Sequence, residues 1–407
     1  GQVDLAQDLL GAGGAMGGKM AVAPRPQKLN VPGTGLGQIY LAKVKATAIM
    51  PHADRKPEED GPAPVYGTLQ EFTEKFADDQ VAMDRLRNKV KVCKNCGKPC
   101  AYTLTECNSC GASLYGIDIS HSDNVFMCFT FGIGAGRFPL KISLRKQSKD
   151  FLCFDDMLSM SVCHLNVIPT SVYCPDLRYL FTDPARGLAL INNLYDFGAT
   201  AAMDLFWSDA EFRRKYWNDE KPPASPMDLY PMALCGMNFP PSQFQLHLQF
   251  IHAPMLPFHF AQARMENHFH YRRFFPLEYL RRALALGERV KMSVNDDTDI
   301  EDIITKVEEL GVNYDEVQVS LLRRCRRMQE RFSPWQEEDF EDYVIGNRVL
   351  DIETLAVKPD DDPKKIQVGD TSALQNYGRP YTQEGKPTGT YYRYPKLPSE
   401  VVAFAQG

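Results

Sequence analysis

Short apolar and alternating segments in the middle of the chain predict the strands of one sheet. The candidates are residues 125–131, 138–144, 151–154, 163–168 and 244–251. In 244–251 polar and apolar residues alternate, so successive side chains would face opposite sides of a sheet. On this pattern Gln245, His247 and Gln249 share one face and the apolar residues between them point towards a core.

Capping signals and helical spacing of apolar residues predict the helices. Asp183 followed by Pro184 marks one helix start. The apolar residues after it recur at helical spacing: Leu190, Ile191, Leu194, Phe197 and Met203. A second helix begins at Pro276 and can end at Gly287.

Three capping motifs predict further helices at the two ends of this central region. Thr68 with Glu71 forms a capping box that begins a helix within 67–92. Similar pairs, Thr298 with Glu301 and Asn313 with Glu316, predict a helical hairpin over 297–331, with Gly311 ending its first helix.

The composition changes towards both ends of the chain. Residues 1–66 are rich in Gly, Ala and Pro, and residues 351–407 are polar with scattered tyrosines, so neither segment can bury a core of its own. We expect both arms to gain order along protein partners. The predicted organisation is an arm, a helix, a cysteine-rich segment, a central domain, a helical extension and an extended tail: 1–66, 67–92, 93–115, 120–290, 291–350 and 351–407.

Charge and cysteine content restrict the function. A net charge of −6 argues against broad nucleic-acid binding, which needs cations to neutralise phosphates. No apolar stretch approaches the roughly 18 residues of a membrane span, and the first residues lack a secretory signal. Eleven cysteines, an odd number with four in one cluster, suit the cytoplasm or another reducing compartment better than a disulfide scaffold.

The cysteine cluster predicts a structural zinc ribbon. Cys93 and Cys96 form one C-x2-C pair, and Cys107 and Cys110 form a second. A glycine follows each pair, which permits the tight turn that places two thiolates on one ion. Four thiolates fill a tetrahedral zinc shell and leave no position for a water, so we expect a folding role. The alternative is four unrelated thiols; Cys100 is expected to stand outside the site.

The row of Gln245, His247 and Gln249 could hold a phosphate. A neutral imidazole can attack phosphorus, and flanking amides can donate hydrogen bonds to the phosphoryl oxygens. Ser242 is a further donor just upstream, and an aspartate at a strand end can accept from two ribose hydroxyls. Taken alone, a histidine on a strand is more often structural than a nucleophile.

Three motifs in order strengthen the functional interpretation. Phe154 and Asp156 form F-x-D; eight residues later His164 begins H-x-N-V-I-P, which ends at Pro169; and Q-L-H-L-Q-F-I begins at Gln245. Together they resemble the histidine triad superfamily. Gln in the last polar position, at Gln249, is similar to the diadenosine tetraphosphate phosphorylase and galactose-1-phosphate uridylyltransferase branches.

That resemblance implies an α+β fold, a histidine-triad-like (HIT-like) antiparallel sheet with packed helices, and a site for a nucleotide or dinucleoside polyphosphate. His247 would be the nucleophile, and Gln249 and Ser242 would hold the phosphate. Asp156 would bind the ribose, with His164 and Asn238 also lining the site. Homodimers are common in the family, so a homodimer is a further expectation that the resemblance leaves open.

Gln245 departs from the family, which has its first histidine at this position. Glutamine can hydrogen bond but cannot carry a proton. Two hypotheses therefore stay open: a nucleotidyl hydrolase, phosphorylase or transferase acting through His247, and a catalytically degenerate subunit of a larger assembly that uses the fold as a scaffold.

Overall fold

The structure is a computed structural model that describes most of the chain between Tyr66 and Phe332 and a short C-terminal segment. The described residues are 39–40, 66–107, 111–135, 144–156, 160–255, 260, 269, 271–332, 343–345, 348–350 and 401–404. Cys110 lies outside them, as does most of the predicted strand 138–144. Among these residues, no helix has both the length and the apolar character needed to cross a membrane.

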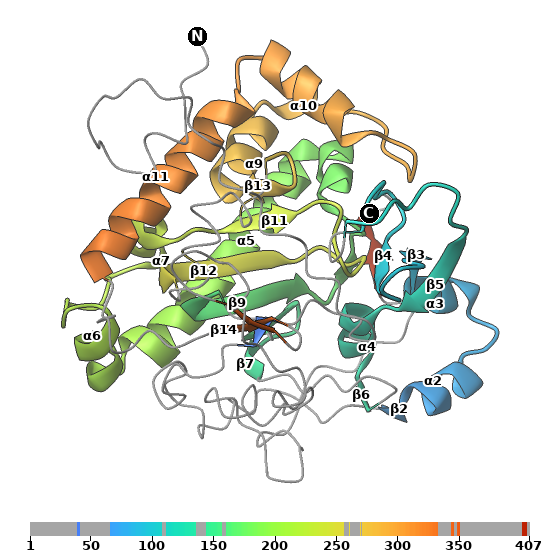
Figure 1. Ribbon diagram of the computed structural model, residues 1–407, viewed down its shortest axis with the longest axis horizontal. Helices are drawn as coiled ribbons and strands as arrows, with labels where there is room; N and C mark the ends of the chain where they lie inside the picture. The colour runs from blue at the N-terminus through green and yellow to red at the C-terminus, as the bar shows by residue number, and fades with distance from the viewer. Residues whose placement is uncertain are drawn as a thin grey trace.

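A six-stranded antiparallel sheet forms the centre of the fold (Figure 1). Its strands lie in the order β13-β11-β12-β9-β8-β7. They are β7 (Leu144–Gln147), β8 (Phe151–Asp155), β9 (Ser161–Pro169), β11 (Gly236–Asn238), β12 (Leu248–Met255) and β13 (Phe274–Pro276). With the helices that pack on it, this sheet confirms the α+β class and the strands predicted at 151–154 and 163–168.

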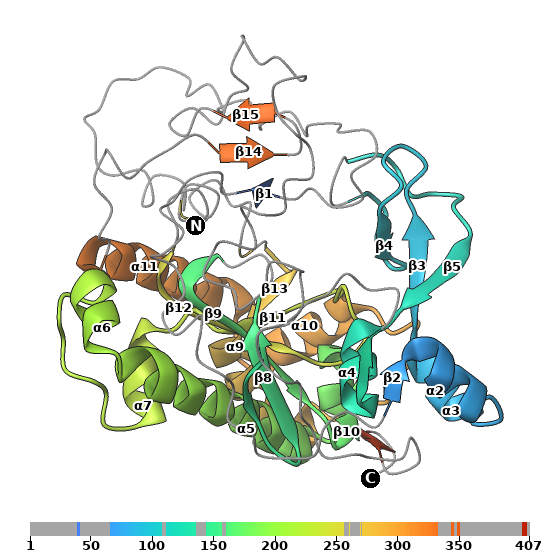
Figure 2. The same ribbon diagram turned by 90° about the horizontal axis from the view of Figure 1, so that it is seen from below.

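Helix α5 (Pro184–Ala202) covers one face of the sheet. Its start was predicted correctly: the Asp183 side chain accepts a hydrogen bond from the Arg186 amide, and Pro184 opens the first turn. Gly198 allows the helix to lie close to the strands, because a Cβ there would be 2.8 Å from Cγ2 of Val167. Helix α9 (Leu277–Leu284) lies on the same side, where Pro276 begins it as expected (Figure 2).

The opposite face is covered at one end by α4 (Val125–Phe131), which corrects the prediction of a strand there. Asn124 caps the helix through the Met127 amide, and Gly132 ends it at φ 78°. The seven residues of α4 have apolar or small side chains, and all of them except Phe126 are buried. The sequence therefore shows no polar face with the periodicity of a helix. Its side chains pack on Leu152, Phe154 and Ile168 of the sheet.

Helix α11 (Tyr314–Phe332) packs over β12 on that same face, where Leu321, Leu322 and Cys325 contact Ile251. The helix that precedes it is α10 (Ile300–Glu309), so both helices predicted within 297–331 are present. The Asn313 side chain caps α11 through the Glu316 amide, as expected. Asp299, and not Thr298, caps α10.

The predicted extension 291–350 is not helical throughout, because β14 (Tyr343–Ile345) and β15 (Arg348–Leu350) form an antiparallel pair after α11. Strand β1 (Ile39–Tyr40) adds to this pair from the N-terminal arm (Figure 2). The arm therefore contributes a strand to a sheet of its own chain.

The segment 67–92 contains two short helices and a strand in place of one helix. The Thr68–Glu71 capping box begins α2 (Leu69–Lys75), as predicted. Asp79 then caps a second helix, α3 (Gln80–Arg85). Strand β3 (Arg87–Val92) follows at once and pairs with β4 (Pro99–Ala101) and β5 (Ile119–Asp123). We call residues 87–123 the cysteine ribbon.

The C-terminal residues return to the body of the molecule. Strand β16 (Val402–Ala403) pairs in parallel with β10 (Val172–Tyr173). Val401 is buried among the side chains of α2, α3 and α4, and Phe404 joins the main core. These four residues of the predicted tail lie on their own chain.

The other short elements connect these parts. They are β2 (Tyr66–Thr68), β6 (Ile133–Ala135), the 3-10 turns Leu177–Thr182, Tyr230–Met232 and Gly287–Arg289, the π-helical turn Met203–Trp207, α6 (Ala210–Tyr216) and α7 (Pro226–Leu229).

His252 is a buried structural histidine on the α5 side of the sheet. Its ring packs against the stacked pair of Trp207 and Trp217, with centroids 5.6 and 4.7 Å away. Nδ1 lies 2.7 Å from the carbonyl oxygen of Ala253, to which it donates, and Nε2 accepts from Nε1–H of Trp207 at 3.3 Å. Burial lowers the pKa of His252 from 6.5 to about 4.

This depressed pKa predicts a loss of stability in mild acid. The unfolded chain takes up the His252 proton below about pH 6.5 and the folded chain only near pH 4, so the free energy of unfolding should fall across that window by about 3 kcal/mol. Urea denaturation of the wild type and His252→Gln between pH 7.5 and 4 measures the difference. A difference between the two proteins that does not change with pH would contradict this prediction.

Candidate functional site

Strand register places a row of polar side chains on the sheet face opposite α5. Gln249 lies directly across from Asn166 on one side and Gly236 on the other, and His164 lies across from Ile251. Residues directly opposite one another, and residues two apart on a strand, share a face. His164, Asn166 and Gln249 therefore lie on one surface, bounded by the side chains of α4 and α11.

His247 lies at the start of this row, immediately before β12. Its Nδ1 lies 2.9 Å from the carbonyl oxygen of Gln245, to which it donates, so in the neutral ring Nε2 carries the lone pair. Burial lowers the pKa of His247, while that hydrogen bond and the carboxylate of Asp156 oppose the shift. The ring is 6% exposed and is therefore a neutral, nearly dry base at neutral pH.

Asp156, at the end of β8, joins the row through Asn166 and His164. Its Oδ2 accepts from Nδ2 of Asn166 at 2.8 Å and lies 3.8 Å from Nε2 of His164. Nδ1 of His164 accepts from the Met160 amide, so Nε2 carries the proton and faces the carboxylate. The Asp156 side chain is 19% exposed, so its carboxylate reaches the surface at this end of the row.

The adjacent carboxylate, Asp155, points to the α5 side and has a different role. It accepts two hydrogen bonds from Arg145, at 2.9 and 2.8 Å, in a buried ion pair. Of the two neighbouring aspartates, Asp156 is therefore the one on the polar face.

Gln245 does not lie in a strand with His247 and Gln249, because β12 begins only at Leu248. Its side chain is fully buried and turns towards the segment after β9. Nε2 donates to the carbonyls of Pro169 and Val172, and Oε1 accepts from the Cys174 amide. Both amide protons are thus used, so Gln245 fixes the backbone and offers no donor to a phosphate.

The remaining predicted residues differ in how well they are placed. Gln249 has a buried Oε1 without a hydrogen-bond partner among the described residues, next in the row to His247. Asn238 ends β11, and extending the register by two residues places it across from His247. Ser242 is exposed in the preceding loop, and no described contact ties it to the row.

Two residues of this site were not predicted from the sequence. Phe126 of α4 contacts the His247 ring edge-on, with centroids 5.1 Å apart, and also contacts Phe154. It was missed because its segment was assigned to a strand. Asn166, which holds the Asp156 carboxylate, could have been found from its place two residues after His164 on one strand.

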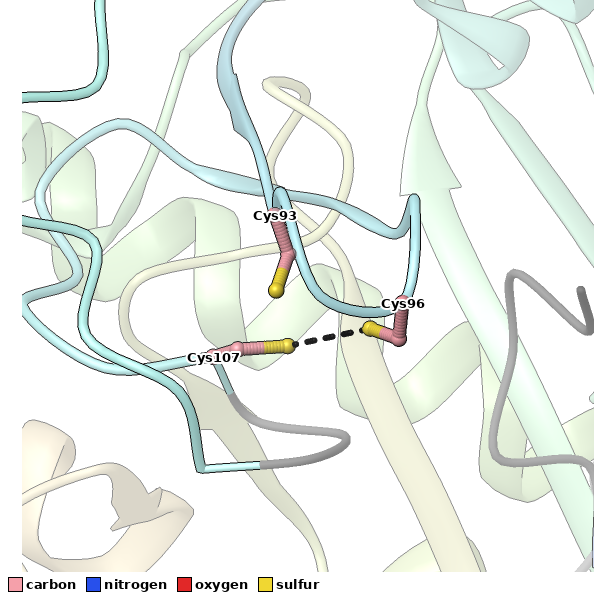
Figure 3. Close-up of side chains that lie close together, drawn as sticks. All are labelled: Cys93, Cys96 and Cys107. Atoms are coloured by element: carbon pink, nitrogen blue, oxygen red, sulfur yellow. Dashed lines mark hydrogen bonds between the residues drawn. The ribbon is translucent and has the colours of Figure 1, made fainter. Parts of the chain in front are cut away.

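The cysteine ribbon brings three thiols together (Figure 3). Sγ atoms of Cys93, Cys96 and Cys107 all lie within 4.8 Å of one another and are buried. Sγ of Cys96 and Cys107 are 3.6 Å apart, close to the roughly 3.8 Å expected for two thiolates on one tetrahedral zinc. This geometry can hold a metal ion.

The two knuckles of the ribbon have the same backbone geometry. Gly97 donates to the Cys93 carbonyl and Gly111 to the Cys107 carbonyl, both at 2.8 Å. The two glycines have φ of 71° and 73°, as the sequence led us to expect. Cys100 stands outside the three-thiol group and donates to Sγ of Cys107 at 3.6 Å. No disulfide links the ten cysteines that the structure describes.

No protein-family model matches the chain, and it matches no curated protein and no solved structure. The assignment of function therefore depends on the residues and their geometry.

Proposed function

We propose that the chain binds a nucleotide on the polar face and that His247 is the nucleophile of a nucleotidyl hydrolase or transferase. The observation that carries this proposal is the hydrogen bond from Nδ1 of His247 to the Gln245 carbonyl. It fixes the tautomer in which Nε2 holds a lone pair, and the lowered pKa keeps that lone pair available at neutral pH.

In the proposed reaction Nε2 of His247 forms a bond to the α-phosphorus of a nucleoside or dinucleoside polyphosphate. The bond from phosphorus to the bridging oxygen breaks, and its electron pair leaves with the departing phosphate. Water or another acceptor then attacks the phosphohistidine, releases the nucleotide and restores the neutral ring. Gln249 and Asn238 carry amides suited to the phosphoryl oxygens, and their protonation does not change in the cycle.

Asp156 is suited to the ribose. Asn166 and His164 orient its carboxylate, and its side chain is 19% exposed at the surface, where two adjacent hydroxyl donors could reach it. Phe126, which is only partly buried and contacts the His247 ring, provides an aromatic edge against which a base can pack. The HIT-like assignment rests on this arrangement together with the sequence motifs.

The cysteine ribbon is proposed to hold one structural zinc ion. Cys93, Cys96 and Cys107 supply three ligands, and the repeated C-x2-C-G knuckle assigns the fourth to Cys110. With four thiolates the metal would hold the fold of the ribbon and supply no open coordination position.

One observation favours the second candidate, a degenerate subunit without catalysis. Gln245 uses its whole side chain on the backbone, so the first position of the triad contributes no group to the phosphate. In that case nucleotide binding or assembly would remain and the covalent step would be absent.

Trapping of the covalent adduct separates the two candidates. Wild-type protein incubated with α-32P-labelled dinucleoside polyphosphate and then denatured should carry acid-labile, base-stable label. His247→Asn should lose that label, because its amide cannot form a phosphoramidate of this kind, whereas His121→Ala, at an exposed histidine of β5, should keep it. Absence of label and turnover in the wild type, with nucleotide still bound, would establish the degenerate subunit.

A further inference from the structure

The loop that carries His247 is held by the cysteine ribbon as well as by the sheet. Asn88 lies on β3, the strand that runs directly into Cys93, and its side chain is fully buried. Its Oδ1 accepts from the Phe244 amide at 2.8 Å, and its Nδ2 donates to Oε1 of Gln243 at 3.2 Å.

A second asparagine, the cap of α4 that directly follows the neighbouring strand β5, completes the contact. Nδ2 of Asn124 donates to the Phe244 carbonyl at 3.0 Å. Both backbone polar groups of Phe244 are thus bound by buried asparagines from the ribbon side. Tyr102, just after β4, also packs on the Phe244 ring, with centroids 5.8 Å apart.

The other end of the loop is tied to the body of the molecule. Gln245 is bound to the backbone after β9, and the Leu246 amide donates to the Cys174 carbonyl. The carbonyl that fixes the His247 ring belongs to Gln245, the residue directly after Phe244. Movement of Phe244 away from Asn88 would therefore shift the acceptor that sets the His247 tautomer.

The ribbon has little apolar material with which to hold Asn88 in place. Its own buried cluster consists of Leu114 and four cysteines, including the three grouped thiols, and only Leu104, Ala112 and Ile117 pack against it from partly exposed positions. Asn88 and Ser122 are paired across β3 and β5, so the position of Asn88 depends on the order of those strands. Small units of this kind depend on a metal for their fold.

We infer that the cysteine ribbon is a metal-dependent positioning element for His247, with Asn88 and Asn124 as its positioning residues. Metal binding orders β3 and β5, the two asparagines hold Phe244, and the Gln245 carbonyl keeps Nδ1 of His247 protonated. The importance of this positioning for catalysis rests on the proposed function. The dependence of the His247 tautomer on the metal-bound ribbon does not.

Nuclear magnetic resonance of the full chain with 15N-labelled histidine and phenylalanine tests the inference without nucleotide. The samples are wild type under reducing conditions, wild type after removal of metal by a chelator, the same sample with zinc restored, Asn88→Leu, Asn88→Asp and Ser120→Ala. Ser120 is the matched control, because its hydroxyl bonds Val90 within the ribbon and not the loop. The His252 ring, with the same tautomer but on the far face, reports the integrity of the core.

We expect metal removal and Asn88→Leu each to abolish the distinct Nδ1–H signal of His247. Exchange of the Phe244 amide should accelerate by roughly tenfold or more, with His252 unchanged. Zinc should restore the wild-type pattern, and Ser120→Ala should match wild type. Asn88→Asp should disturb the Phe244 amide as Asn88→Leu does, because it places a buried carboxylate against the oxygens of Asp123 and Gln243. Unchanged His247 and Phe244 signals after metal removal, or loss of the His252 signals in both cases, would overturn the inference.

This outcome is independent of the adduct experiment. A chain that forms no phosphohistidine can still show the coupling, which would leave the inference standing and the nucleotidyl-transfer proposal refuted. A chain that forms the adduct equally well with and without metal, and shows unchanged ring signals, would refute the coupling alone.

Discussion

Replacing Cys107 with serine is expected to abolish metal binding by the chain. Cys107 is fully buried at the centre of the three-thiol group, 3.6 Å from Cys96 through their Sγ atoms, and serine cannot supply a thiolate. Structural zinc in comparable sites contributes about 10–16 kcal/mol of apparent binding energy at neutral pH, and this energy is also folding energy. Loss of one ligand should therefore leave residues 87–123 without stable amide protection.

Metal content by mass spectrometry and amide hydrogen exchange measure both effects. The wild type should carry one zinc per chain, and Cys107→Ser should carry essentially none. Cys100→Ser is the matched control, since Cys100 is buried in the same ribbon but stands outside the three-thiol group. Retention of stoichiometric zinc by Cys107→Ser, or its loss from Cys100→Ser alone, would show that the ligand set is assigned incorrectly.

Replacing Asp155 with alanine should destabilise the main core by about 3–5 kcal/mol. The side chains of Arg145 and Asp155 are only 3% and 2% exposed, so the change leaves a guanidinium buried without its carboxylate. Urea denaturation gives the free energy of unfolding directly. A double variant, Arg145→Met with Asp155→Leu, should recover much of that loss, because it removes both charges and refills the space.

The next residue on β7 offers a control for this comparison. Lys146 pairs with Asp204 at 3.0 Å, but their side chains are 23% and 49% exposed. Asp204→Ala should cost less than about 1 kcal/mol, because water screens the pair. Equal losses of unfolding free energy in Asp155→Ala and Asp204→Ala would mean that burial does not set the strength of the Arg145–Asp155 pair.

The parts of the molecule that were predictable from sequence are those set by local rules. The C-x2-C-G repeat gave the two knuckles, including the left-handed glycines Gly97 and Gly111. The Asp183-Pro184 and Thr68–Glu71 signals located the starts of α5 and α2 correctly. In each case the deciding hydrogen bonds join residues within a few positions of one another.

The errors arose where distant residues decide the structure. The alternating pattern predicted that Gln245 lies in a strand. Its side-chain amide instead forms hydrogen bonds with the backbone of Pro169, Val172 and Cys174, more than 70 positions away. The hydrogen bond from the Phe244 amide to the Asn88 side chain likewise joins residues 156 positions apart. The helix at 125–131 was missed because it is buried on nearly all sides, which removes the polar period that identifies a helix.

The docking of Val401 has a consequence for how the chain folds as it is made. Val401 fills a core with Leu69, Phe72 and Met83, and its carbonyl accepts from Arg85, 316 positions earlier. At roughly 5–20 residues per second, translation of that interval takes about 15–60 seconds. During that time the apolar surfaces of α2, α3 and α4 lack the Val401 side chain that covers them in the folded chain. The nascent protein therefore exposes apolar surface to which chaperones can bind.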